Sequence, residues 1–119
     1  MTKQLVYSKE WLKLIDNMQH IVDESKMIQP SYFYLEILRR KERSAATLRW
    51  RARGTNGSSL VFSDPYMQRV LASLPVALQR KYVELEVKKV DLNQQAAQLR
   101  LLLSGRLARF HDRQLELQV

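Results

Sequence analysis

The chain has 119 residues, of which 45% are hydrophobic and 27% are charged, a composition typical of a single globular domain over residues 1–119. It contains no cysteine, which excludes a disulfide framework, a thiolate nucleophile and a cysteine-based zinc site. The net charge of +8 and the pI near 10.0 favour a polyanionic partner, with nucleic acid first and an acidic protein or an anionic membrane surface behind it.

The first predicted element is an amphipathic helix over about residues 8–24. Ser8 is a good N-cap residue, and apolar residues follow it at helical spacing. These residues are Trp11, Leu14, Ile15, Met18, Ile21 and Val22. We expect this apolar face to pack on the sheet that follows. The chain shows no secretory signal and no stretch near the ~20 apolar residues that span a bilayer, so we expect a cytoplasmic protein without membrane contact.

Residues 32–40 and 45–53 predict two antiparallel strands joined by a polar turn, because both runs are rich in β-branched, aromatic and long apolar residues. Alternation places six apolar residues on one face, which we expect to be buried. They are Phe33, Leu35, Ile37, Leu48, Trp50 and Ala52. If opposite positions sum to 85, Leu35 pairs with Trp50 and Ile37 pairs with Leu48.

The other face of this predicted hairpin is basic and aromatic. Residues 39–53 hold seven basic residues and one acid, so they carry +6 of the net charge of +8. Guanidinium groups bind phosphate bidentately, and both guanidinium and tyrosine rings stack on bases. The candidate binding residues for single-stranded or distorted DNA are Arg39, Arg40, Arg49, Arg51, Arg53, Tyr32 and Tyr34. Alternatively, these charges guard an exposed strand against aggregation, with Glu36 paired to Arg49 across the ladder.

A turn and two further elements follow the hairpin. Residues 54–58 are rich in glycine and polar residues and predict a turn, and residues 59–62 predict a short third strand. The sheet is then a two- or three-stranded meander. Ser63 or Asp64 caps a short helix over residues 65–73, with Pro65 at its first position.

Residues 75–116 predict a long C-terminal helix that packs on one face of the sheet. Its main apolar stripe consists of Leu78, Tyr82, Leu85, Leu92, Ala96, Leu99, Leu103 and Phe110, and Lys89 interrupts this stripe. A second stripe of Val83, Val87, Val90, Ala97 and Leu101 is expected alongside the first, which widens the buried face.

About 40 helical residues would extend roughly 60 Å, which exceeds a domain of this size. Either the helix breaks at Ser104 and Gly105 and its last part folds back, or it projects and pairs with a second chain. Core packing is the expected role of its first half, and dimer contact is an equal alternative for its second half. Leu99, Leu103 and Phe110 are the candidate residues for a homodimer or another protein partner.

The sequence contains no pattern for catalysis. Paired carboxylates in an apolar setting, an HExxH motif, a glycine-rich dinucleotide loop and a Ser, His and acid triad are all missing. We therefore expect a protein that is not an enzyme and that holds no cofactor and no metal.

Two motifs carry a family resemblance. They are Leu48-Arg49-Trp50-Arg51, and Leu85-Glu86-x-x-Lys89-Val90-x-Leu92-Asn93-x-Gln95 preceded by Leu74-Pro75. Over roughly residues 47–95 the chain resembles a family of uncharacterised small proteins encoded on integrative and conjugative elements of proteobacteria. That family usually has arginine where this chain has Lys89. The resemblance implies a setting among genes that handle single-stranded DNA and maintain the element, and it gives Trp50, Glu86, Lys89 and Asn93 a shared role.

Glu86 and Asn93 are seven residues apart on the long helix and therefore lie on the same face. We expect both side chains to hydrogen-bond the hairpin backbone, which would fix the hairpin on the helix.

The sequence thus predicts an α+β domain with an N-terminal helix, a meander, a short helix and a long C-terminal helix. The predicted function is that of a non-enzymatic accessory protein of a mobile genetic element, which binds single-stranded or distorted DNA through the hairpin. The alternative is a dimeric adaptor or inhibitor that uses the long helix for recognition, while its arginines meet an acidic protein.

Overall fold

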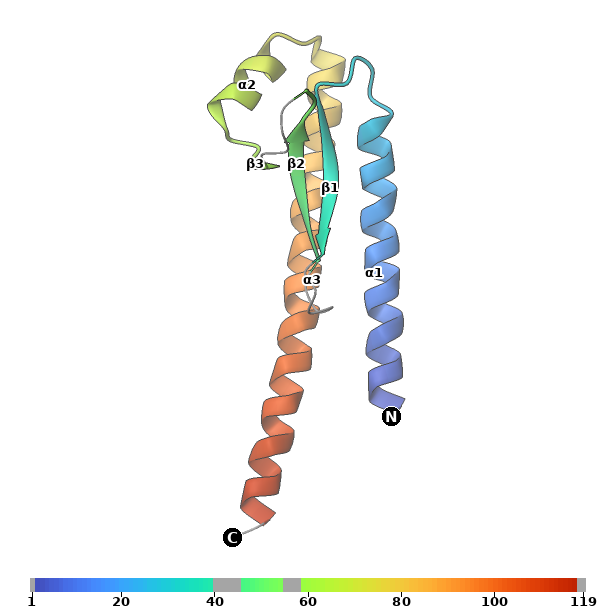
Figure 1. The fold of residues 1–119 in the computed structure, drawn as a ribbon, viewed down its shortest axis with the longest axis vertical. Coiled ribbons are helices and arrows are strands. Elements are labelled where there is room, and N and C mark those ends of the chain that lie inside the picture. Colours follow the sequence, from blue (N-terminus) through green and yellow to red (C-terminus); the bar gives the residue numbers. More distant parts are fainter. Residues whose placement is uncertain (1, 40–45, 55–58, 118–119) are drawn as a thin grey trace.

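The computed structural model describes residues 2–39, 46–54 and 59–117, with side chains described for residues 9–39, 46–54 and 59–102. The elements follow in the order α1 (Thr2–Lys26), β1 (Phe33–Arg39), β2 (Ala46–Ala52), β3 (Ser59–Leu60), α2 (Pro65–Ala72) and α3 (Val76–Leu117). The α+β class and the predicted order of elements are confirmed (Figure 1).

The fold has a layer of two helices and a layer of sheet. α1 and α3 run antiparallel, and the antiparallel sheet with strand order β1-β2-β3 packs on them, with β1 against α1 and β2 against α3 (Figure 1). The N-terminus of α1 and the C-terminus of α3 lie at the same end of the molecule. α3 extends far beyond the sheet, and the molecule measures 66 × 25 × 24 Å.

The core forms where the apolar face of the hairpin meets the two helices. The predicted register is confirmed, because Leu35 pairs with Trp50 and Ile37 pairs with Leu48. Phe33, Leu35 and Trp50 are fully buried, as is Leu48, and Ile37 is half-buried. Each large apolar side chain that is removed from water in this way stabilises the fold by about 2–3 kcal/mol.

Aromatic rings from the sheet and from α3 meet in this core. Tyr82 of α3 has its ring centroid 5.7 Å from that of Trp50 and 6.0 Å from that of Phe33, in tilted and edge-on contacts. The ring centroid of Phe62 lies 6.1 Å from that of Trp50, in a tilted contact. The predicted apolar stripe of α3 is accordingly buried as far as its described side chains extend, from the half-buried Leu78 to Leu99.

α1 begins earlier than its cap residue predicts. The helix starts at Thr2, so Ser8 lies inside it and the prediction of Ser8 as the N-cap was wrong. Serine costs only about 0.5 kcal/mol in a helix interior, and the residues upstream include the good helix formers Lys3, Gln4 and Leu5. The helix therefore continues through Ser8. The predicted apolar face is confirmed, because Leu14, Met18, Ile21 and Val22 are buried, while Trp11 and Ile15 are half-buried.

The chain enters α2 through a tight turn that shortens the third strand. The amide of Asp64 donates to the carbonyl of Val61 at 3.0 Å, so β3 ends at Leu60 and not at Phe62. The carboxylate of Asp64 accepts from the amide of Tyr66 at 2.9 Å, and Pro65 occupies the first helical position. Of the two predicted caps, Asp64 is the one used.

α3 is a single helix that continues through Ser104 and Gly105 to Leu117. Of the two arrangements left open by the sequence, the projecting helix is the one observed.

The two apolar stripes of α3 do not form one wide buried face, and that prediction was wrong. Val83 and Val87 are exposed, while Leu85 between them is buried. Each residue of a helix advances 100°, so positions two apart lie on nearly opposite sides. Leu99 is 8% exposed and belongs to the buried side, so it does not offer a surface to a partner. The side chains of the other two candidates, Leu103 and Phe110, lie outside the described residues.

Candidate nucleic-acid interface

Two polar side chains fix the edges of the hairpin to the helices. At the outer edge of β1, the buried hydroxyl of Ser25 accepts a hydrogen bond from the amide of Leu35 at 2.8 Å and donates to the carbonyl of Val22 at 2.6 Å. On β2, the side-chain amide of Asn93 accepts from the Leu48 amide at 2.9 Å and donates to the Leu48 carbonyl at 3.2 Å. These groups replace hydrogen bonds that a further strand would make at each edge.

Glu86 and Lys89 hold the indole ring of Trp50. The carboxylate of Glu86 accepts from the indole Nε1 at 3.4 Å and lies 2.5 Å from the Lys89 ammonium nitrogen. Both charged side chains are largely buried, with exposed fractions of 14% and 15%. The predicted backbone bond is therefore confirmed for Asn93, whereas Glu86 binds a side chain instead. The cluster also explains why Lys89 interrupts the apolar stripe, since its charge neutralises a carboxylate that the core shields from water.

The face of the hairpin away from the helices carries a group of residues that we call the basic-aromatic face: Tyr32, Tyr34, Arg49, Arg51 and Arg53. Tyr32 is 43% exposed, Arg49 and Arg53 are exposed, and Tyr34 and Arg51 are half-buried. The register places Tyr34 opposite Arg51, and the amide of Arg53 donates to the carbonyl of Tyr32 at 3.0 Å. The rings of Tyr32 and Tyr34, at the start of β1, therefore lie beside guanidinium groups on β2 and directly after it.

Several contacts within this face order its side chains. The guanidinium of Arg53 lies 5.3 Å from the ring centroid of Tyr34, a cation–π contact, and its Nε donates to the Ser31 hydroxyl at 2.5 Å. Arg49 donates from Nη1 to the Ser59 hydroxyl at 3.4 Å. These contacts hold the arginine side chains along the sheet surface.

The acid on this face pairs differently from the sequence prediction. Glu36 lies opposite Arg49 in the register, yet its ion pair is with Arg51, one step diagonally across the ladder. Diagonal neighbours in an antiparallel pair remain within reach of a long side chain, which allows this choice. One of the three arginine charges is thus matched locally, and the interface is less basic than the sequence count indicates.

The remaining two arginines of the sequence prediction do not join this group. Arg39 is exposed at the end of β1, but it lies an even number of residues from the buried Phe33 and so on the other side of the strand from Tyr34. Arg40 lies outside the described residues. A count of charge along the chain groups these residues with the others because it ignores the strand faces.

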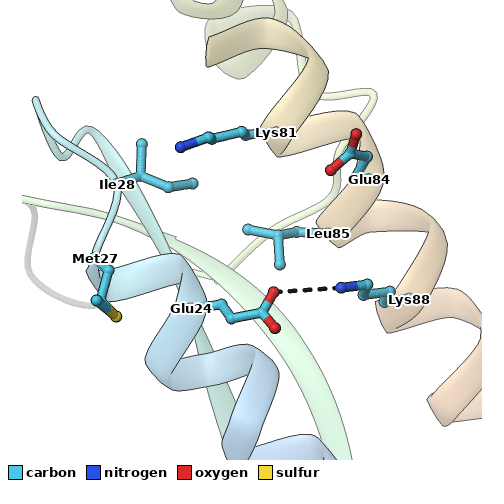
Figure 2. A pocket seen from close by; sticks show the side chains of 7 residues that line it. All are labelled: Glu24, Met27, Ile28, Lys81, Glu84, Leu85 and Lys88. Carbon is cyan, nitrogen blue, oxygen red and sulfur yellow. Dashed lines mark hydrogen bonds and ion pairs between the residues drawn. The ribbon is translucent and has the colours of Figure 1, made fainter. Parts of the chain in front are cut away.

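Beyond the sheet, a groove lies between the C-terminal end of α1 and the first half of α3 (Figure 2). It is lined by Glu24, Met27, Ile28, Lys81, Glu84, Leu85 and Lys88. Lys88 and Glu24 form an ion pair across it at 3.4 Å. The groove holds two lysines and two glutamates, so it carries no net charge that would select an anion.

Within residues 2–39, 46–54 and 59–117, no helix combines the length and apolarity needed to cross a membrane. In the same part of the chain, no cluster of three or more metal-binding side chains is present.

Comparisons of the chain with protein-family models, with curated proteins and with solved structures gave no significant match. The resemblance to proteins of conjugative elements therefore stays a prediction.

Proposed function

We propose that this protein is a non-enzymatic nucleic-acid-binding accessory protein that binds single-stranded or distorted DNA through the basic-aromatic face of its hairpin. The observation that carries the proposal is the pairing of two rows on one open sheet face, with arginines on and directly after β2 beside tyrosines at the start of β1. The opposite face of the same strands is buried on the helices, so the rows are held in a fixed geometry.

The spacing of these residues suits an extended strand of nucleic acid. Arg49 and Arg51 alternate along β2, so their backbone positions are about 7 Å apart, and Arg53 follows directly after the strand. Guanidinium groups bind phosphate bidentately, and a tyrosine ring accepts a stacked base of any sequence. The exposed ring of Tyr32 supplies such a stacking surface next to the arginine row. A single strand presents phosphates and unstacked bases together, which a flat sheet face can bind.

The cellular setting of the proposal rests on the family resemblance. Motif residues Trp50, Glu86, Lys89 and Asn93 build the support beneath the hairpin. If relatives on conjugative elements share that support, its role in them is to present the same face of the hairpin. The protein would then act as an accessory protein of a mobile element in the cytoplasm.

Fluorescence anisotropy of a labelled single-stranded oligonucleotide, titrated at several salt concentrations beside a duplex, tests the proposal. If Arg49, Arg51 and Arg53 neutralise about three phosphates, the slope of log K against log salt should be about −2. The double variant Arg49→Ala with Arg53→Ala should make that slope shallower by about 1.4, since each lost contact with a single strand removes about 0.7.

The matched control is Arg69→Ala with Arg100→Ala, which removes the same charge from exposed positions on α2 and α3. Equal loss of binding in both double variants would show that net charge alone attracts DNA, and it would overturn the assignment to the hairpin. Binding of duplex that is as tight as binding of the single strand would exclude the stacking role of Tyr32.

A second candidate is the adaptor that recognises another protein through α3. The exposed valines of α3 favour it. If this candidate is right, binding of the partner protein should be unchanged by Arg49→Ala with Arg53→Ala. It should be lost when the exposed valines of α3 are replaced.

A further inference from the structure

The side of α3 that points away from the core carries an apolar stripe, which we call the outer stripe: Val76, Val83, Val87, Val90, Ala97 and Leu101. Val87 is 64% exposed, Leu101 is 70% exposed, and the others are exposed as well. The buried residues Leu85 and Leu92 lie on the opposite side of the same helix. α3 is therefore apolar on two opposite sides, of which the sheet and α1 cover one.

The spacing of the outer stripe is that of a coiled-coil seam. From Val83 the steps to Val87, Val90, Gln94, Ala97 and Leu101 are four, three, four, three and four residues. This alternation is the a/d pattern of a heptad repeat, with Gln94 as its polar member from Val83 onward. Between Val76 and Val83 the same register passes through Arg80. Valine is a weaker helix former than the residues usual on a solvated helix face, so helix propensity does not account for its use here.

We infer that the outer stripe is an interface at which two copies of this chain pair, α3 against α3. From Val76 to Leu101 the stripe spans about 38 Å, so its occupant must be a helix of similar length with the same repeat. Among the described helices, α1 uses its apolar face on the sheet and α2 has only eight residues. α3 itself presents the matching seam, and a two-fold axis then covers both stripes with one self-complementary contact.

The size of the stripe agrees with this occupant. The four valines and Leu101 are 44–70% exposed, which leaves roughly 400 Å² of apolar surface in water on each copy. A standard protein interface buries ~800 Å² per partner, of which somewhat more than half is apolar. The stripe thus supplies about the apolar share that a stable dimer requires. A second helix also reaches it without displacing α1 or the sheet, because the stripe lies opposite the core.

The mass of the full chain in solution, measured by sedimentation velocity over a range of micromolar concentrations, tests this inference. The wild type should sediment as two chains and Val87→Lys as one. The matched control is Val61→Lys, because Val61 has the same 64% exposure but lies after β3, away from the outer stripe. This control should remain a dimer. Leu101→Lys, at the far end of the stripe, should behave as Val87→Lys does.

Circular dichroism of each variant shows whether a change in mass comes with a change in folding. All three positions are exposed, so we expect the fold to tolerate lysine there. A wild-type chain that stays monomeric throughout the range would overturn the inference, and it would leave the stripe to a helix of another protein. A dimer that persists in both Val87→Lys and Leu101→Lys would place the contact elsewhere. The inference does not depend on nucleic-acid binding, so either result is separable from the anisotropy experiment.

Discussion

The side-chain amide of Asn93 pairs with both backbone hydrogen-bonding groups of Leu48, at 2.9 Å to the nitrogen and 3.2 Å to the oxygen. An amide on α3 thereby takes the place of a peptide group from a neighbouring strand. β3 covers β2 only at Trp50 and Arg51, so this contact extends the covered edge beyond the end of β3. The hairpin is consequently tied to α3 through its backbone and not only through apolar packing.

Asn93→Asp tests this pairing. The aspartate still accepts from the Leu48 amide, but it no longer donates to the Leu48 carbonyl and sets a carboxylate oxygen against it. We expect a loss of about 2–3 kcal/mol in the free energy of unfolding, seen as a lower urea midpoint at an unchanged m value. Gln98→Glu is the control, because it makes the same amide-to-acid change at an exposed position of α3. Equal effects of the two substitutions would mean that charge, and not the lost donor, is responsible.

Ser25→Ala tests the contact at the other edge. It leaves the buried amide of Leu35 without its acceptor, so we expect a loss of about 1–3 kcal/mol and faster hydrogen exchange at Leu35. Ser73 makes the same 2.6 Å bond to the carbonyl three residues before it but is exposed and contacts no strand. Ser73→Ala should therefore change stability by less than about 0.5 kcal/mol. If Ser25→Ala is as mild as Ser73→Ala, the edge contact does not stabilise the fold.

Lys89→Met tests the charged pair beside Trp50. Removal of the ammonium leaves the shielded carboxylate of Glu86 without its counter-charge, and we expect a loss of about 1–3 kcal/mol in urea unfolding followed by tryptophan fluorescence. The addition of Glu86→Gln should recover part of that loss, because glutamine keeps an acceptor for the indole and carries no charge. A double variant that is less stable than Lys89→Met alone would contradict this account of the pair.

Leu99 and Leu101 should respond in opposite ways to the same substitution. Leu99→Asp places a carboxylate at a position that is 8% exposed. Because a buried charge without a partner is costly, we expect the free energy of unfolding to fall by about 3 kcal/mol or more. Leu101→Asp changes a residue that is 70% exposed, and monomer stability should shift by less than about 0.5 kcal/mol. The measurement is thermal unfolding at low protein concentration, where association does not contribute. Similar unfolding of both variants would contradict the assignment of the two sides of α3.

The sequence predicts the hairpin well because strand alternation has a strict period of two. The faces follow from this rule, and the register assumed with them, in which Leu35 pairs with Trp50, is the one observed. The cap of α2 was narrowed to Ser63 or Asp64, of which Asp64 is used. The bond from Asn93 to the hairpin backbone also follows, since a seven-residue spacing places residues on one helix face.

Other features depend on tertiary contacts that local patterns do not contain. A helical pattern shows that α3 has two apolar stripes, but only the position of the sheet decides that Leu85 is buried and Val87 is exposed. The pairing of Glu36 with Arg51 depends on the side-chain geometry of one diagonal. The contact from Ser25 to Leu35 joins two elements through a serine that no motif distinguishes.

The central claim, that the basic-aromatic face binds nucleic acid, is tested most directly by amide and side-chain chemical shifts of the isotope-labelled chain during titration with a single-stranded oligonucleotide. We predict saturable shifts at Tyr32, Tyr34, Arg49 and Arg53, with the outer stripe of α3 unchanged. No shifts on the hairpin at saturating oligonucleotide, or shifts confined to the basic residues of α3, would contradict the claim.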